Sequence, residues 1–279
     1  MNTTFSIILP AYKTRFLKEC IDSVLAQTYP NWELIIVNDA SPEDMDSIVL
    51  QYHDARIHYY KNKQNYGAEH LVHQWNYCLS LAQGEYVICL GDDDKLLPSC
   101  LATYAALVTR YPDVEILHGQ TDIMDENGQL IEHTVPRPET ESAMSLLYHR
   151  TENVYNHQYI GDFCYKTKPL KARGGFYYLP LAWGSDDISA VEASVAHGIA
   201  NTQEVVFLYR QNRFTISNSK HTLSKIIAVG REAKWKRHFL QQPMTDHQDE
   251  IYRLQLKKKL WALTLKKWYN IIVKAFLRK

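Results

Sequence analysis

Two hydrophobic patterns alternate along the first 112 residues: short apolar runs, and segments in which apolar residues recur at three- and four-residue intervals. The short runs are rich in β-branched and aromatic residues and predict strands at 4–9, 34–37, 56–62 and 85–90. The helical spacing predicts helices at 16–25, 68–83 and 98–111. Ser41 followed by Pro42 predicts one more helix start, because serine caps helices and proline fits the first turn.

Strands separated by helices of this length predict an α/β fold with a mostly parallel sheet covered on both faces. In such sheets ligands bind beyond the carboxyl ends of the strands. Asp39 follows the second predicted strand, and Asp92 to Asp94 follow the fourth. We therefore expect both acidic sites at the same edge of the sheet.

Asp92, Asp93 and Asp94 stand side by side in the stretch CLGDDDKLLP. Like charges this close raise one another's pKa and oppose folding unless a cation or hydrogen-bond donors offset them. A solvated turn is one interpretation of the run, and a cation site is the other. Carboxylate oxygens are ligands that suit Mg²⁺ and Mn²⁺.

The alternation weakens after residue 112. The pattern predicts a hairpin around Asn127 and Gly128, followed by helices at 142–149 and 187–197 and a strand at 204–210. We expect residues 1–220 to form one domain and residues 221–279 to form a helical extension.

The extension has a basic, amphipathic end. From Lys257 onward every charged residue is basic, and an apolar stripe at helical spacing comprises Trp261, Leu265, Trp268, Ile272 and Phe276. Such a helix fits the surface of an anionic membrane. The alternative is that the stripe packs on the main domain and the lysines are only solvated.

Bulk composition narrows the classes of partner and compartment. With 31 basic and 31 acidic residues the net charge is zero, so no overall field favours nucleic acid. The five cysteines form no CxxC pair, which is typical of reduced thiols in cytosol. Pro10 interrupts the first apolar run, and no stretch approaches the roughly 18 apolar residues of a membrane span. We expect a cytoplasmic protein that at most lies on the inner face of the cell membrane.

Four motifs stand in a fixed order: SIILPAY, VNDAS, NYG with CLGDDDKLLP, and WGSDDISA. In this order, over residues 4–212, the sequence resembles the family 2 glycosyltransferases. The resemblance implies the GT-A fold, a nucleotide-diphosphate sugar donor, usually a UDP-sugar, and inversion at the anomeric carbon. It also implies that residues 1–112 bind the donor and residues 113–220 bind the acceptor.

The resemblance assigns roles to residues of the first half. Pro10, Ala11 and Tyr12 would line the nucleoside pocket, and Asp39 would contact the base or ribose. The positions that match the family's Asn-x-Gly, and would shape the same pocket, are Asn65 and Gly67.

The acidic run departs from the family's common Asp-Ser-Asp-Asp form, because Gly91 stands at the first aspartate position. The resemblance then makes Asp93 a ligand of Mn²⁺ or Mg²⁺ and Asp94 a supporting group. Asp92 becomes a candidate for the ribose or a metal-bound water, and which aspartate takes which role stays open.

Family members carry Glu-Asp at the start of a helix, and the aspartate is the general base. Counting back from Gly198 places this pair on Asp186 and Asp187, so the glutamate is absent. Asp187 is the expected base, although a shift of one residue exchanges the two. The alternative is that both acids only favour a helix N-terminus.

Other residues have a weaker claim to function. His70 and His73 lie three apart on a predicted helix without a third ligand at motif spacing, which favours a structural role. Arg210 and Arg213 are candidates to bind diphosphate or to form surface ion pairs. His221 is a weak candidate for a metal ligand. Acceptor-site candidates that are equally typical of a core are Tyr159, Phe163, Phe176, Tyr177, Tyr178 and Trp183.

We therefore expect an inverting glycosyltransferase that moves a sugar to a hydroxyl of a glycan or lipid-linked acceptor in cell-surface polysaccharide or glycoconjugate assembly. One alternative is a catalytically degenerate sugar-nucleotide-binding scaffold at a membrane. Another is a metal-dependent nucleotidyltransferase, although no Gly-rich basic loop follows the first strand. A phosphoaspartyl hydrolase needs an early Asp-x-Asp-x-Thr, where this chain has LPAYK.

Overall fold

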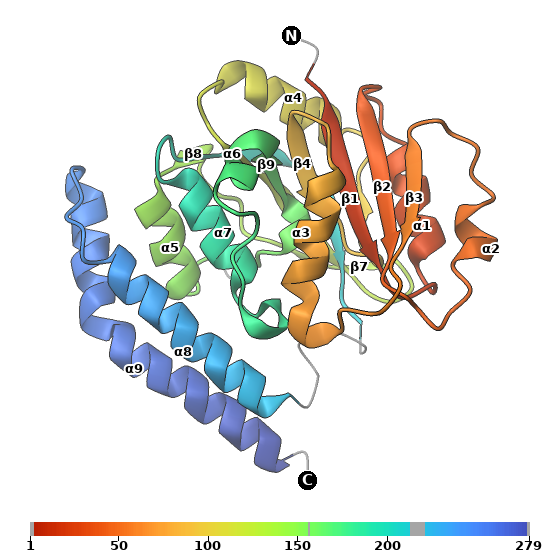
Figure 1. Cartoon of the computed structure of the whole chain (residues 1–279). Helices are drawn as coiled ribbons and strands as arrows, with labels where there is room; N and C mark the ends of the chain where they lie inside the picture. The colour runs from red at the N-terminus through yellow and green to blue at the C-terminus, as the bar shows by residue number, and fades with distance from the viewer. Residues whose placement is uncertain (1–2, 156, 213–220, 278–279) are drawn as a thin grey trace.

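The protein is described by a computed structural model that covers residues 3–155, 157–212 and 221–277. Its centre is a ten-stranded sheet with the order β3-β2-β1-β4-β9-β6-β10-β5, to which β7 adds beside β6 and β8 beside β10. Helices cover both faces, and a pair of long helices projects from one side (Figure 1). The expected α/β architecture is confirmed.

The strands are β1 (Phe5–Ala11), β2 (Trp32–Asn38), β3 (Ile57–Lys61), β4 (Tyr86–Cys89), β5 (Lys95–Leu96), β6 (Ile116–Met124), β7 (Leu130–His133), β8 (Thr140–Glu141), β9 (Phe163–Lys166) and β10 (Ile199–Arg210). The α-helices are α1 (Leu17–Leu25), α2 (Asp46–Val49), α3 (Leu71–Leu81), α4 (Cys100–Arg110), α5 (Ala143–Thr151), α6 (Thr167–Ala172), α7 (Ser185–Ser194), α8 (Thr222–Phe239) and α9 (His247–Leu277). Three 3₁₀ turns are η1 (Ala68–His70), η2 (Ile160–Asp162) and η3 (Pro180–Ala182).

The first four long strands run parallel, as their separation by helices predicts. β1 pairs in parallel with both β2 and β4, and β2 pairs in parallel with β3. β9 then runs antiparallel between β4 and β6, and β10 returns parallel to β6. The carboxyl ends of β1 to β4 therefore meet at one edge, and the segments that follow them lie together there.

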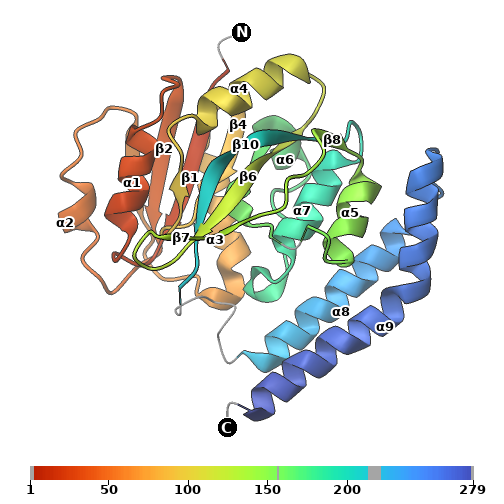
Figure 2. The same cartoon turned by 180° about the vertical axis from the view of Figure 1, so that it is seen from behind.

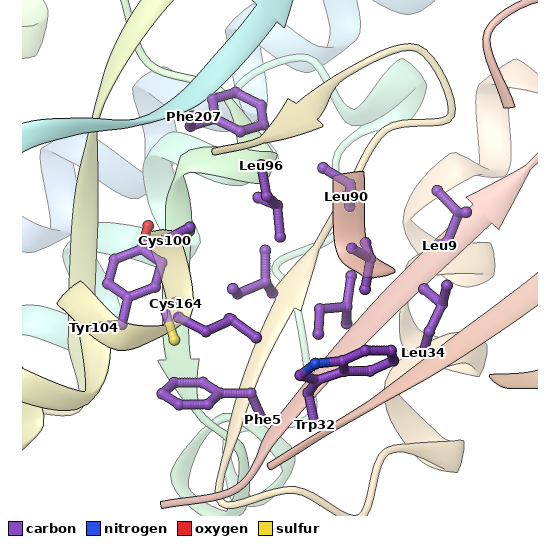
Figure 3. Close-up of a cluster of buried hydrophobic side chains, with 14 of the residues drawn as sticks. Phe5, Leu9, Trp32, Leu34, Leu90, Leu96, Cys100, Tyr104, Cys164 and Phe207 are labelled. Carbon is purple, nitrogen blue, oxygen red and sulfur yellow. The ribbon is translucent and has the colours of Figure 1, made fainter. Parts of the chain in front are cut away.

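Two hydrophobic layers hold the sheet. One packs α1, α2 and α4 against one face (Figure 2), and its centre contains side chains such as Phe5, Trp32 and Phe207 (Figure 3). The other packs α3, α5, α6 and α7 against the opposite face. Every strand from β1 to β4 except the edge strand β3 is almost wholly buried, which explains the near-continuous apolar runs in the sequence.

The hairpin around Asn127 and Gly128 is confirmed as the β6–β7 pair. The helix predicted to start at Ser41 is wrong, since residues 41–45 are irregular and α2 begins at Asp46. The Ser41 hydroxyl donates to the Tyr12 carbonyl at 2.6 Å and accepts from the Glu43 N–H at 3.0 Å. The serine therefore links two loops at the carboxyl edge instead of starting a helix.

The last two helices form an antiparallel hairpin, which confirms a helical extension over the described residues. Trp268 of α9 donates its indole N–H to the Ile226 carbonyl of α8 at 3.0 Å. The hairpin also packs on the sheet domain, because Tyr252 stacks on Tyr148 of α5 with ring centroids 4.1 Å apart. No helix in the described ranges is both long and apolar enough to cross a membrane. The domain boundary at residue 220 stays a prediction.

The close packing of β1 on the chain before β4 yields a stability prediction. A Cβ at Gly84 would lie 2.6 Å from the Ser6 backbone nitrogen, whereas one at Gly230 of α8 would make an ordinary contact of 3.5 Å with Trp268. We expect Gly84→Ala to lower the free energy of unfolding by about 1–3 kcal/mol through overpacking. Gly230→Ala should raise it by about 0.5–1 kcal/mol, because alanine is the better helix former. Urea denaturation measures both, and equal effects would contradict the packing described.

Candidate functional site

Asp92 joins the ends of two strands. Its Oδ2 accepts hydrogen bonds from the backbone N–H groups of Tyr12 at 2.8 Å and Lys13 at 2.7 Å, although 80 residues separate Tyr12 from Asp92. Tyr12 directly follows Pro10 and Ala11 of β1. The structure therefore brings the first expected donor motif and the acidic run together, at the carboxyl edge of the sheet.

Asp39 organises the segment that follows β3. Its backbone N–H donates to the Ala11 carbonyl at 2.9 Å, and its carboxylate accepts from the Tyr66 N–H at 3.1 Å and the Asn62 side chain at 2.7 Å. Burial raises the pKa of Asp39, although these donors oppose the shift. The expected grouping of Asp39 with the Asn-x-Gly segment is thus present.

Within that segment, Asn65 shapes the backbone. Its side-chain oxygen accepts a hydrogen bond from the N–H of Gly67, whose φ of 75° lies in the left-handed region. Glycine adopts this conformation without the steric cost that other residues incur. The glycine is therefore required where the chain turns from the sheet edge into η1.

The carboxylates of Asp93 and Asp94 converge. A Cβ at Gly91 would lie 3.2 Å from Asp93 Oδ1 and 2.8 Å from Asp94 Oδ2. The second of these contacts is closer than Cβ atoms tolerate, so a side chain at residue 91 would force the Asp94 carboxylate to move. The departure from the common acidic pattern therefore has a steric reason: this loop folds its carboxylates into the space beside Gly91.

Negative charge is costly in this loop, first because the loop is buried and then because its carboxylates repel one another. Burial and the neighbouring Asp93 charge raise the pKa of Asp92 to about 6. Burial, Asp93 and Asp92 raise the pKa of Asp94 further. Both shifts show that negative charge at this position is unfavourable without a compensating cation or donor.

Arg210 compensates part of this charge from the end of β10. Its backbone N–H donates to Asp94 Oδ1 at 2.9 Å, and its Nε donates to the Asp93 carbonyl at 2.8 Å. Its guanidinium also binds Glu19 at 2.8 Å and lies over the Phe16 ring. Because Arg210 is only 1% exposed, it neither forms a surface ion pair nor is free to bind diphosphate. It is a buried residue that holds the acidic run in place.

Two other sequence candidates have different outcomes. Arg213 lies outside the described residues. His221 Nδ1 lies 3.5 Å from Glu69 Oε1, so this histidine pairs with a residue of η1 and not with the acidic run.

The donor set of the loop fits a divalent cation in part. The described residues contain no group of three or more histidine, cysteine or acidic side chains arranged to hold a metal. Asp93 and Asp94 nevertheless offer converging carboxylate oxygens, and a diphosphate would bring further hard oxygen ligands. These two residues are the ones that would hold the cation.

Asp187 lies in the first turn of α7 and is tightly oriented. Its Oδ1 accepts from Arg150 Nε at 2.8 Å and from Gln158 Nε2 at 2.8 Å. Arg137 donates to the Gln158 side-chain oxygen at 2.8 Å, which fixes the direction of that amide. The sequence gives no sign of Arg150, Gln158 or Arg137, because none of them belongs to a recognisable motif.

Asp186 precedes Asp187 and differs from it in surroundings. Burial and the Asp187 charge raise the pKa of Asp186 to about 8, although Arg150 opposes the shift. Because α7 begins at Ser185, both acids lie in its first turn, two residues earlier than the helix was expected to start. Neighbouring carboxyl groups with contrasting environments are typical of acid–base sites.

The aromatic acceptor candidates divide between core and edge. Phe163 and Phe176 are buried in the hydrophobic layer of α3, α5, α6 and α7. Tyr159 stacks on Tyr209 at the end of β10, with ring centroids 3.6 Å apart. Tyr178 contacts the histidines of η1 and α3.

The chain matches known proteins in both sequence and structure. The model of the family described as Glycosyl transferase family 2 matches residues 6–171. The putative teichuronic acid biosynthesis glycosyltransferase TuaG of Bacillus subtilis is 41% identical over 93 residues, which cover 32% of this chain and 36% of TuaG. The first curated relatives are much longer, and the chain spans about a fifth of their length.

Solved structures show the same fold. S. aureus TarS 1–349 in complex with UDP-GlcNAc matches with a TM-score of 0.66 and 15% identity, over 96% of this chain and 90% of that one. The mannosyltransferase PcManGT of Pyrobaculum calidifontis, in complex with GDP-Man and Mn²⁺, matches with a TM-score of 0.61 and 16% identity, over 100% of this chain and 76% of that one. The expected GT-A fold is confirmed.

The raised pKa of Asp186 predicts a pH-dependent stability. A carboxyl group with a pKa near 4 when unfolded and about 8 when folded stabilises the protein below pH 4, and this contribution is lost as the pH rises toward 8. We expect Asp186→Asn to exceed the wild type in free energy of unfolding by about 1–2 kcal/mol at pH 8.5. At pH 5 the difference should shrink. Urea denaturation at both pH values measures it, and an equal difference at the two would contradict the assignment.

Proposed function

Because the chain belongs to glycosyltransferase family 2, we propose that it transfers a sugar from a UDP-sugar to a hydroxyl group, with inversion at the anomeric carbon. The observation that carries this proposal is the junction at the carboxyl edge, where Asp92 binds the backbone after β1 and Asp93 and Asp94 converge beside it. The parallel strands of an α/β sheet present ligand sites at this edge.

The donor would lie across the ends of β1 and β2. Asp39 lies beside Pro10, Ala11 and Tyr12, and its carboxylate accepts a hydrogen bond from the Tyr66 N–H. Tyr12 is 42% exposed, so its ring is available to a nucleoside. Two solved relatives of the fold hold UDP-GlcNAc and GDP-Man, which supports a nucleotide-diphosphate sugar as the class of donor.

Asp93 and Asp94 would hold Mn²⁺ or Mg²⁺. The cation would offset negative charge on the departing diphosphate. The protein's own part is to fix the two carboxylates in place, which it does through Asn212 for Asp93 and Arg210 for Asp94. The mannosyltransferase of the same fold is described with Mn²⁺, which supports this choice of metal.

Asp187 would act as the general base. The ion pair with Arg150 and the Gln158 amide hold one of its oxygens, which leaves Oδ2 for the acceptor hydroxyl. Asp187 would take the proton from that hydroxyl as the new glycosidic bond forms. Asp186, whose raised pKa keeps it protonated at neutral pH, is the less suited of the two acids to accept a proton.

The acceptor would be a glycan or a lipid-linked saccharide. TuaG is named for teichuronic acid biosynthesis and WcaA of Escherichia coli for colanic acid biosynthesis. These names support a role in the assembly of a cell-surface polysaccharide. A catalytically degenerate scaffold is the less favoured alternative. The same chain has the expected donor residues at the carboxyl edge, the carboxylates of Asp93 and Asp94, and an oriented Asp187.

Replacing the base tests this function directly. We expect Asp187→Asn to lower the rate of UDP-sugar turnover in Mn²⁺ by about 100- to 10,000-fold, because proton transfer is lost. The dissociation constant for the donor should stay within about threefold, since Asp187 belongs to the acceptor side. The surface variant Asp113→Asn is the matched control. Wild-type turnover in Asp187→Asn would contradict the role, and no turnover of any UDP-sugar by the wild type would contradict the function.

We also propose that α9 lies on an anionic membrane. One stripe of its apolar side chains is between 41% and 70% exposed and comprises Trp261, Leu265, Tyr269, Ile272 and Phe276. Trp268 does not belong to this face, because it packs on α8. Exposed lysines on the same helix include Lys257, Lys258, Lys266 and Lys274. Apolar and basic side chains together fit the interface of an anionic bilayer.

Vesicle sedimentation tests the membrane surface. We expect the full chain to bind vesicles of equal parts phosphatidylglycerol and phosphatidylcholine, with weaker binding at high salt because the lysine attraction is screened. A triple variant, Trp261→Ser, Tyr269→Ser and Phe276→Ser, should bind at least about tenfold more weakly. Leu50→Ser and Val195→Ser replace similarly exposed side chains elsewhere and serve as controls. Equal binding by the triple variant and the controls would remove the proposal.

A further inference from the structure

Four rings contact one another where η1, α3 and the segment before η3 meet. His70, His73 and Tyr178 form a triangle, in which the His70 and His73 centroids lie 5.7 Å apart, and Tyr66 lies beside His73. His73 stacks on Tyr178 with ring centroids 4.6 Å apart and an interplanar angle of 23°. Tyr66 lies 6.5 Å from His73, and His70 lies 6.4 Å from Tyr178 at an interplanar angle of 15°. We name these four residues the ring row.

Three rings of the ring row are exposed to solvent, whereas Tyr178 is half-buried against the hydrophobic layer of α3, α5, α6 and α7. Tyr66 is 38% exposed, and both His70 and His73 belong to the exposed class. Aromatic rings that only complete a core are buried, as Phe176 is two residues before Tyr178. The structural role that the spacing of His70 and His73 favours in the sequence stays a prediction.

The ring row lies beside the proposed donor pocket and on a segment that leads to the helix of the proposed base. The Tyr66 N–H binds the carboxylate of Asp39, which places one end beside the donor pocket. Tyr178 belongs to the segment that leads through η3 into α7, where Asp186 and Asp187 lie. Figure 1 shows the start of α3 and the turn before α7 close together at the lower edge of the sheet.

The surrounding backbone holds the ring row in place. Asn76 of α3 accepts from the Phe176 N–H at 2.7 Å and donates to the Phe176 carbonyl at 3.1 Å, which fixes the segment that carries Tyr178. Glu69 accepts a hydrogen bond from Ser224, at the start of α8. These hydrogen bonds fix the backbone that carries the rings, so the rings can contact a ligand without rearrangement.

Chemistry favours a saccharide as the ligand. Stacked rings offer flat apolar faces to the C–H surfaces of sugars, while ring nitrogens and the Tyr178 hydroxyl offer hydrogen bonds to sugar hydroxyls. His70 Nδ1 and the Tyr178 hydroxyl lie 3.2 Å apart, so these two polar atoms contact each other. A metal is not favoured, since no metal-holding group of three such side chains exists among the described residues.

We propose that the ring row binds the saccharide chain of the acceptor and leads its end from solvent toward Asp187. This inference rests on the proposed function and names a binding surface for its acceptor. The row would contact sugar units beyond the one that reacts, so it would set acceptor length and affinity and take no part in the chemistry.

The test uses the full chain labelled with ¹³C in its histidines, with UDP and Mg²⁺ present, because Mg²⁺ is diamagnetic and leaves the ring signals sharp. Cellohexaose, chitohexaose and maltohexaose are titrated separately while the histidine ring signals are followed by NMR. We expect at least one hexasaccharide to shift the His70 and His73 signals, with a dissociation constant of about 0.1–1 mM. The shorter disaccharide of the same sugar should bind at least about tenfold more weakly, because it covers fewer rings.

Variants separate the row from the rest of the surface. Tyr178→Ala and His73→Ala should weaken hexasaccharide binding by about tenfold, while Tyr178→Phe should retain most of it because the stacking face remains. His53→Ala combined with Tyr60→Ala, at exposed positions elsewhere, is the matched control, and melting temperatures report whether each variant folds.

The outcomes distinguish this inference from the function on which it rests. If no hexasaccharide shifts the two histidine signals, or if the row variants bind as well as the control, the ring row is not the acceptor surface. Binding of UDP is measured in the same samples by calorimetry. UDP binding without saccharide binding overturns only the ring row, whereas the absence of UDP binding overturns the proposed function.

Discussion

The burial of neighbouring carboxylates at Asp92 to Asp94 is the constraint on which the rest of the site depends, and the charge of Asp93 adds repulsion to it. Two distant parts of the chain supply the donors that make this loop possible: the backbone after β1 binds Asp92, and Arg210 at the end of β10 binds Asp94. The Arg210 and Asp94 contacts join residues 116 positions apart. The sheet order makes both contacts possible, since β4 lies beside β1 and the short strand β5, directly after the acidic run, pairs with β10. The fold and the acidic loop therefore require each other.

A second charged arrangement stands on the acceptor side. Asp187 is held by a cation and an amide, in contrast to the acidic loop, where like charges crowd together. The C-terminal hairpin reaches this region, because a Cβ at Gly184 would lie 3.6 Å from the Glu232 carboxyl carbon of α8. Glu232 is buried with Lys236 and receives Lys267 from α9. The extension thus braces the start of the helix that carries the proposed base, and the same extension bears the surface proposed to meet the membrane.

The sequence predicts secondary structure and local motifs, but it does not reveal contacts between residues far apart in the chain. Buried parallel strands leave near-continuous apolar runs, so β1, β2 and β4 were predictable, and acids directly after such strands mark the carboxyl edge. Ser41 and Pro42 match a helix start locally, but a tertiary contact with the Tyr12 carbonyl uses the serine hydroxyl instead. Arg210, which binds the acidic run, and the partners of Asp187 lie far along the chain from the residues that they contact. Nothing in their local sequence marks these roles. The histidines of η1 and α3 were judged by metal spacing alone, and only the packing of Tyr178 against them reveals the ring row.

The central claim is that Asp93 and Asp94 hold a divalent cation against a diphosphate, and thermal unfolding with UDP tests it most directly. A ligand present at 100 times its dissociation constant adds about 2.7 kcal/mol to the native state. For a chain of this size the melting temperature should then rise by roughly 5–10 °C. We expect this rise with UDP and Mn²⁺ together, little or none with UDP and a chelator, and its loss in Asp93→Ala. An equal rise with and without Mn²⁺, or a full rise in Asp93→Ala, would contradict the account.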